Sequence, residues 1–102
     1  MKKSDRLCYA DTSVEIKLGD RILFRHLLGG KTEGIVFYMP GESLPHPEME
    51  FGGIREWAIR LDNGRVISWP YLPGEVKVSK RVKFIERAKG EFKGLQPDDE
   101  LL

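Results

Sequence analysis

Cysteine and histidine, the residues that form disulfides and bind metal ions, are scarce in this chain. Its 102 residues include a single cysteine, Cys8, and two histidines. One cysteine cannot form an internal disulfide, and such usage is typical of a reducing compartment. Neither histidine lies close in sequence to the other or to Cys8, although a zinc site is usually built from such close pairs. We therefore expect no metal, no cofactor and a cytoplasmic location.

Long apolar stretches are also missing. The longest strongly apolar run, at 35–39, is far shorter than the roughly 20 residues that span a bilayer. The basic start of the chain lacks the apolar segment of a signal peptide. We therefore expect no membrane partner.

Recognisable catalytic groups are few as well. Ser43 and His46 lie three residues apart in a proline-bounded segment, and this spacing matches no hydrolase motif. Cys8 has no histidine near it in sequence to activate it. The glutamates around His46 lack the Asp-rich pattern of a calcium-binding loop. We expect no catalytic residues and no metal ligands, and interpret the chain as a non-enzymatic protein.

The net charge of +1 hides an uneven distribution along the chain. Residues 32–56 carry five acidic side chains against one basic, whereas residues 57–90 carry eight basic against three acidic. Neighbouring segments of opposite charge commonly neutralise each other on a folded surface. The same distribution also allows each segment to bind a partner of its own.

What the sequence does contain is a series of short strand patterns. Apolar residues alternate with polar ones, and β-branched and aromatic residues are frequent, as in strands. Asn63-Gly64 lies between two such patterns and predicts a hairpin with a type I′ turn. No amphipathic helix of ten residues is apparent. The expected strands lie at 14–18, 21–27, 35–39, 54–61, 65–69 and 76–87, and the last of these is either one long strand or a bent pair.

These patterns predict an all-β domain at 14–89, folded as a small antiparallel barrel of five to six strands. The long proline-rich loop at 39–53 interrupts it. Residues 1–13 are expected to be a polar N-terminal arm and residues 90–102 an acidic C-terminal tail. Docking of this tail through Phe92, Leu95 and Leu101 remains open.

The stretch from Leu18 to Met39 resembles the opening of an SH3-like barrel. It contains Gly-Asp, an apolar strand, a turn with Gly30 and Gly34, and a second apolar strand. KOW-type RNA-binding modules and CAP-Gly modules begin in a similar way. After Leu61 the chain lacks the Gly-Lys-Asn-Asp-Gly groove with which CAP-Gly modules bind an acidic C-terminus. The resemblance therefore implies a fold and not a ligand.

The segment 39–53 is the main candidate for a binding site. It holds three of the six prolines, and Pro45 and Pro47 favour an extended, stiff backbone. A loop that is ordered beforehand loses less entropy on binding, and aromatic residues beside it are typical of interface hot spots. The expected binding residues are Tyr38, Glu42, His46, Glu48, Glu50, Phe51, Trp57, Trp69 and Tyr71.

The exposure of the aromatic candidates differs. Trp57 and Trp69 share strand faces with aliphatic residues, so the core is the favoured position for both. Tyr71 and His46 are flanked by prolines and are expected to be exposed.

Two interpretations of this loop remain open. In the first, the acidic loop is a recognition surface for an unidentified protein partner, as in a small regulatory or immunity-type protein that is a monomer or weak dimer. In the second, the loop is a lid folded over the open end of the barrel. The direction of Leu44, Met49 and Phe51 separates them, because a lid requires these side chains to point inward.

A basic strand offers an alternative function. If residues 77–89 are extended, Lys77, Ser79, Arg81 and Lys83 share one face, and successive side chains are roughly 6.6 Å apart, close to the spacing of phosphates along a nucleic-acid strand. Binding of RNA or single-stranded DNA is therefore a second hypothesis. Lysines that protect an exposed edge strand from unwanted pairing would give the same pattern.

Overall fold

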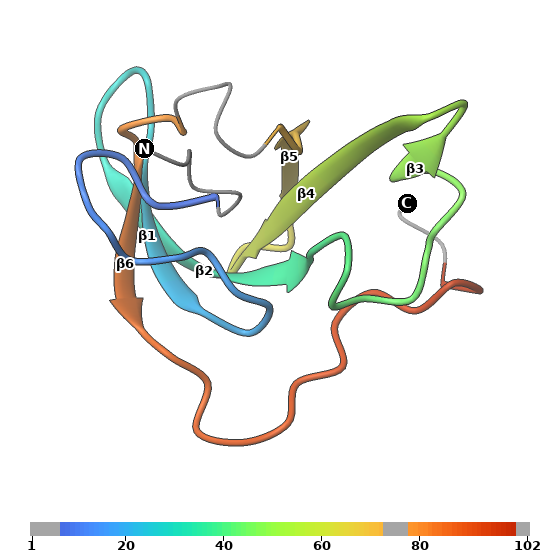
Figure 1. Ribbon diagram of the computed structural model, residues 1–102. Helices are drawn as coiled ribbons and strands as arrows, with labels where there is room; N and C mark the ends of the chain where they lie inside the picture. The colour runs from blue at the N-terminus through green and yellow to red at the C-terminus, as the bar shows by residue number, and fades with distance from the viewer. Residues whose placement is uncertain (1–6, 73–77, 100–102) are drawn as a thin grey trace, which may run out of the picture.

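The structure is a computed structural model that describes residues 7–72 and 78–99, and these residues form an all-β fold (Figure 1). All strand pairs are antiparallel, and the described ranges contain no helix. The prediction of an all-β domain with five to six antiparallel strands is confirmed. The strands are β1 (Arg21–Arg25), β2 (Lys31–Tyr38), β3 (Glu50–Phe51), β4 (Ile54–Leu61), β5 (Val66–Pro70) and β6 (Val82–Glu86).

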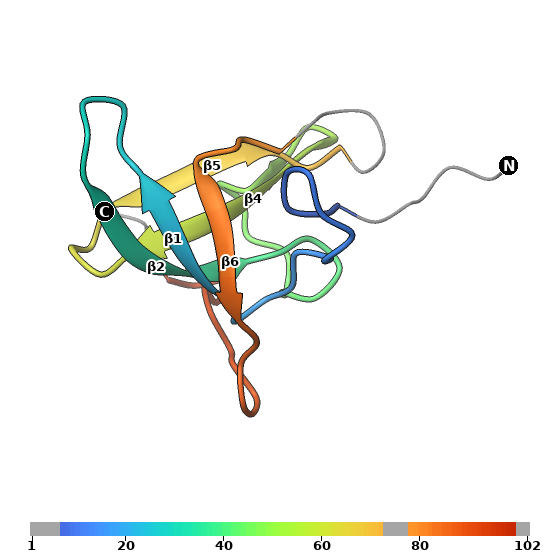
Figure 2. The same cartoon turned by 90° about the vertical axis from the view of Figure 1, so that its left-hand side faces the viewer.

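The six strands belong to one curled sheet. β6 pairs with β1, β1 with β2, and β2 with β4, while β4 also pairs with β3 and β5. Figure 2 shows β1 and β6 lying across β4 and β5. Within the described ranges no hydrogen-bonded pair joins β5 to β6, so the sheet is curled but its ladder is not closed.

The expected strand at 14–18 is wrong. This segment makes only an isolated bridge between Glu15 and Cys8, because a tight turn follows at once. The Lys17 N–H donates to the Asp20 carboxylate at 2.9 Å, and the Asp20 N–H donates to the Lys17 carbonyl at 3.1 Å. Ile16 is nevertheless buried, as the alternating pattern implies.

The turn after β4 also differs from the expected type. A type I′ turn needs positive φ at both central residues. Gly64 has φ 91°, but Asn63 does not lie in the positive-φ region. The Leu61 N–H donates to the Arg65 carbonyl at 2.8 Å, which leaves a three-residue loop. This is the pattern of a type I turn followed by a left-handed glycine.

The first apolar cluster fills the concave side of the sheet and includes part of the expected N-terminal arm. Leu7 and Tyr9 are buried in it, so the arm prediction is wrong at these residues, whereas residues 11–13 are exposed and residues 1–6 lie outside the described ranges. Leu7 and Tyr9 are two residues apart and point to the same side. A single apolar pair in a polar segment is too short a pattern to predict a strand. The other buried members are Ile16, Ile22, Phe24, Val36, Met39, Trp57, Ile59, Leu61 and Val82.

A second apolar cluster lies on the opposite side of β2 and β4, as the alternation of strand side chains requires. The 39–53 loop and the C-terminal segment supply part of it, through Met49 and Leu95. These two segments therefore cover a sheet face that would otherwise be exposed. The buried members are Phe37, Tyr38, Met49, Ala58 and Leu95, with Ile35, Val66 and Phe92 packed against them.

A β-bulge explains how the C-terminal segment docks. The register between β2 and β4 shifts between Val36 and Tyr38, which leaves Phe37 without a ladder partner. The Phe37 carbonyl instead accepts the Leu95 N–H at 2.8 Å. Gly94, with φ 64°, packs so closely that a Cβ there would lie 2.1 Å from the Phe37 oxygen. The open question about the tail is thus answered for Leu95, which docks, and for Phe92, which packs beside it, while Leu101 lies outside the described ranges.

Candidate binding surfaces

His46 is an internal anchor and not an exposed recognition residue. Its side chain is only 2% exposed, which contradicts the expectation. Its Nδ1 accepts the Glu48 N–H at 3.1 Å, so its Nε2 carries the proton and donates to the Asp99 carbonyl at 2.8 Å. The flanking prolines are exposed while the imidazole between them turns inward. His46 therefore ties the loop to the C-terminal segment.

Tyr38 forms a second anchor for the same loop. Its buried hydroxyl donates to the Glu50 carboxylate and accepts the His46 N–H at 3.1 Å. Glu50 also pairs with Arg55 at 3.3 Å. Burial, followed by the hydrogen bond to Glu50, raises the pKa of Tyr38 to about 12. Tyr38 and Glu50 thus hold the loop in place instead of facing a partner.

The β3–β4 hairpin tip, residues 51–54, presents the most exposed apolar pair near the loop. Phe51 and Ile54 lie directly opposite each other and are 77% and 66% exposed. Gly52 and Gly53 both have positive φ, as a two-residue type I′ turn requires. The Gly-Gly signal could have identified this hairpin, but the sequence analysis missed Ile54.

The three side chains that separate the two interpretations of the loop do not all point the same way. Met49 points inward and is buried, as a lid requires. Leu44 and Phe51 point outward, and Glu42 and Glu48 are exposed. The loop is therefore a lid over the second cluster whose outer side carries apolar and acidic groups.

The remaining aromatic candidates lie around Trp57. Trp57 is buried and stacks on half-buried Trp69, with ring centroids 4.8 Å apart. Tyr71 is half-buried rather than exposed, because the Arg55 guanidinium lies over its ring at 5.0 Å. Trp57 is thus unavailable to a partner, whereas one edge of Trp69 and Tyr71 remains accessible.

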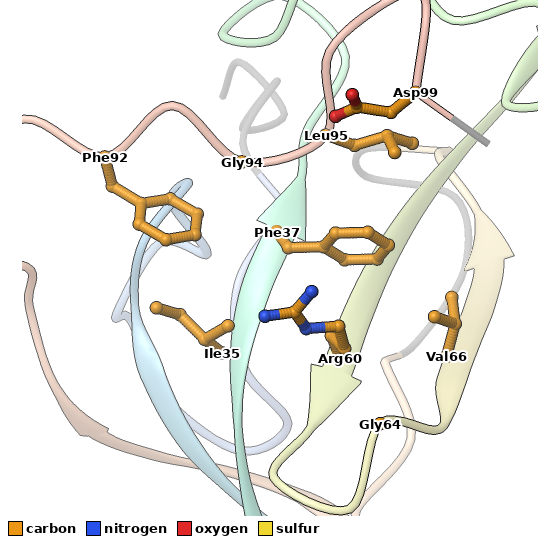
Figure 3. Close-up of a pocket in the computed structure, with 9 residues that line it drawn as sticks. All are labelled: Ile35, Phe37, Arg60, Gly64, Val66, Phe92, Gly94, Leu95 and Asp99. Atoms are coloured by element: carbon orange, nitrogen blue, oxygen red, sulfur yellow. The ribbon is translucent and has the colours of Figure 1, made fainter. Parts of the chain in front are cut away.

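A hollow lies between the second cluster and the C-terminal segment (Figure 3). Its volume is about 470 Å³. Figure 3 shows the Arg60 guanidinium pointing into it below the Phe37 ring. The alternation of side chains along β4 places Arg60 on the face of the strand opposite to that of Trp57 and Ile59. No sequence signal predicts that residues 92–99 line the same hollow. The lining residues are Ile35, Phe37, Arg60, Gly64, Val66, Phe92, Gly94, Leu95 and Asp99.

A basic surface, formed by Arg25, Lys31, Arg81 and Lys83, lies at the other end of the sheet. Arg25 pairs with Lys31 across β1 and β2, and its N–H donates to the Arg81 carbonyl at 2.9 Å. Lys83 lies opposite Leu23 in the β1–β6 pair. Arg81 and Lys83 were expected from the sequence, Lys77 lies outside the described ranges, and Arg25 and Lys31 were missed because only the hairpin register brings them there.

Exposed leucines lie beside this basic surface. Leu27 and Leu28 form the β1–β2 turn and are 75% and 98% exposed. Arg25, Lys31 and Arg81 line a shallow hollow together with this turn. Figures 1 and 2 place the turn well away from the acidic loop. The two charge groups therefore do not neutralise each other locally.

The described part of the chain does not assemble a metal site. No group of three or more His, Cys, Asp or Glu side chains lies close enough there to hold a metal ion. Those same residues contain no helix that is long and apolar enough to cross a membrane.

Comparison with known proteins assigns neither a family nor a function. No protein-family model, no curated protein and no solved structure matches the chain.

The buried tyrosines predict a loss of stability at alkaline pH. The pKa of Tyr38 rises from 10.0 to about 12 in the folded protein, and burial together with a hydrogen bond to Asp20 also raises that of Tyr9. Above pH 10 the unfolded chain therefore binds fewer protons than the folded one, so the free energy of unfolding falls as pH rises toward 12. Urea unfolding followed by tryptophan fluorescence should show this fall, and it should be shallower in Tyr38→Phe. Equal slopes in both proteins would contradict the assignment.

Proposed function

We propose that this protein is a non-enzymatic binding module whose β3–β4 hairpin tip docks on a protein partner. The observation that carries the proposal is the exposed Phe51–Ile54 pair on a tight hairpin. Large apolar side chains that are held in place before binding are typical of interface hot spots. His46 and Tyr38 support this role indirectly, because they fix the loop that leads into the hairpin.

The surroundings of the tip favour a basic partner with an apolar recess. Glu42 and Glu48 are exposed on the loop, and segment 32–56 carries the acidic excess of the chain. Complementary charge raises the association rate and suppresses wrong partners. A regulatory or immunity-type protein that covers a basic protein surface fits this arrangement. The SH3-like resemblance and the cytoplasmic location stay predictions.

The test is affinity capture from the native cell with the full-length protein and matched variants. Phe51→Ser with Ile54→Ser should reduce the captured partner at least tenfold, since hot-spot residues each contribute about 2 kcal/mol or more. Leu27→Ser with Leu28→Ser, at the other end, should leave capture unchanged. Circular dichroism and melting should show that both variants stay folded. Unchanged capture by the Phe51/Ile54 variant would overturn the proposal.

The basic surface favours a second candidate function, the binding of single-stranded nucleic acid. Its four cations come from β1, β2 and the β6 region, and none forms an ion pair with another described residue. Uncompensated cations on neighbouring strands suit a phosphate backbone. His26, half-buried beside them, offers an edge to a base.

Fluorescence anisotropy with mixed-sequence oligonucleotides tests this second candidate. In a plot of the logarithm of the binding constant against the logarithm of the salt concentration, each phosphate contact contributes roughly −0.7 to the slope. Four contacts therefore give a slope of about −3. Arg25→Glu with Lys83→Glu should abolish binding, while Lys93→Glu, on the C-terminal segment, should not. The absence of binding at low salt would exclude this function.

A further inference from the structure

Arg60 is the one basic residue among the described residues that line the hollow. It lies in β4 between Ile35 of β2 and Val66 of β5 in the cross-strand register, so both lateral neighbours are aliphatic. Its side chain forms no ion pair or hydrogen bond with another described residue. Arg60 is exposed, and Figure 3 shows its guanidinium beside Ile35 and below the Phe37 ring. An exposed cation thus borders apolar side chains and has no side-chain partner among the described residues.

The one acidic side chain among the described lining residues, that of Asp99, does not supply that partner. One Asp99 carboxylate oxygen accepts the Gln96 N–H at 2.9 Å, and its carbonyl accepts the proton of His46 at 2.8 Å. Figure 3 shows the Asp99 carboxylate beyond Leu95, on the far side of the Phe37 ring from Arg60. Arg60 therefore faces the hollow with its five donors available.

The walls of the hollow are fixed before any ligand arrives. Gly94 packs against the Phe37 carbonyl, and the Leu95 N–H donates a hydrogen bond to it. His46 donates a hydrogen bond to the Asp99 carbonyl. Phe92 closes the side nearest Ile35 (Figure 3). The volume of about 470 Å³ lies within the roughly 300–1,000 Å³ of small-molecule sites.

We propose that this hollow binds a small carboxylic acid with an apolar body, whose carboxylate pairs with Arg60 and whose body packs on Phe37, Phe92 and Leu95. Planar guanidinium groups bind carboxylates through two parallel hydrogen bonds, which gives both strength and orientation. The apolar lining selects against small hydrophilic anions, because they gain nothing from the walls. This site lies on the second cluster and uses none of the residues proposed to bind a protein, so each proposal stands or fails alone.

The probes are octanoate and octanamide, which share one apolar chain and differ in charge. Isothermal titration of the full-length protein should show octanoate binding at least tenfold more tightly than octanamide. Methyl resonances of Ile35, Val66 and Leu95 should shift on addition of octanoate. Arg60→Gln should weaken octanoate binding at least tenfold, while Arg65→Gln, an exposed arginine in the neighbouring turn, should not.

The proposal would be overturned by equal affinity for the two probes, by unchanged octanoate affinity in Arg60→Gln, or by octanoate shifts confined to Leu27, Leu28 and Phe51 with none in the hollow. Absence of octanoate binding at millimolar concentration would overturn it as well. The comparison of the two probes on the unmodified protein decides the question even if Arg60→Gln fails to fold.

Discussion

Replacing Asp20 by alanine is expected to lower the free energy of unfolding by about 3–5 kcal/mol, because three hydrogen-bond donors lose their acceptor, at a cost of about 1–3 kcal/mol for each donor left buried. Asp20 is fully buried. Its Oδ2 accepts the Tyr9 hydroxyl at 2.7 Å, the Arg87 guanidinium at 2.7 Å and the Lys17 N–H at 2.9 Å. One carboxylate therefore joins the N-terminal segment, the turn before β1 and the residue after β6. Urea unfolding at neutral pH measures the loss.

Asp62→Ala is the matched control for this experiment. Asp62 also pairs with an arginine, Arg21, at 2.6 Å, but its side chain is 52% exposed. Exposed pairs contribute less than about 1 kcal/mol, so this variant should be nearly as stable as the unmodified protein. An equal loss of stability in both variants would show that the Asp20 carboxylate does not hold the three segments together.

His46→Ala should lower the free energy of unfolding by about 2–4 kcal/mol, because it removes a large buried side chain and two hydrogen bonds. Amide hydrogen exchange should also become faster at Glu48 and Leu95, since the first loses its acceptor and the second lies on the segment that His46 holds. The change should therefore loosen the loop and the C-terminal segment together.

Two conservative variants separate the roles of the imidazole nitrogens. Asn at position 46 can place an acceptor near Nδ1 for the Glu48 N–H, and Gln can place a donor near Nε2 for the Asp99 carbonyl. Each should lose less stability than His46→Ala, and Gln should keep the slow exchange at Leu95. A loss below about 0.5 kcal/mol for His46→Ala, typical of surface substitutions, would show that the loop is anchored otherwise.

Strand patterns carry enough information for the fold class. The alternation in 54–61 correctly places Trp57, Ile59 and Leu61 in the core, because a half-buried strand has a side-chain period of two. The same rule failed at 14–18. There the Asp20 carboxylate accepts the Lys17 N–H, so the chain forms a turn in place of a strand ladder. Local competition by a polar side chain is not visible in hydrophobic periodicity.

The candidate site was harder to predict, because burial of the loop depends on contacts distant in sequence. His46 bonds to a residue 53 positions away, and nothing around it in sequence indicates this partner. Exposure of Phe51 and Ile54 follows from the short hairpin, which a Gly-Gly pair could have revealed. Arg25 and Lys31 join the basic surface only through the register of β1 and β2.

The length of the proline-rich loop now has a physical reason. A single sheet of this size leaves one face open to water, and the short strands cannot cover it. The loop and residues 92–99 close that face together through Met49 and Leu95. The stiffness that keeps the loop in this position also fixes the β3–β4 hairpin tip beyond it.

Photo-cross-linking in the native cell tests most directly whether that tip is the protein-binding surface. A benzoylphenylalanine would be placed at position 51 of the full-length protein in one experiment and at position 28 in another, since both positions are exposed and lie at opposite ends. The account predicts a cross-link to one basic protein from position 51 and none to that protein from position 28. A cross-link from position 28 with none from position 51 would contradict it.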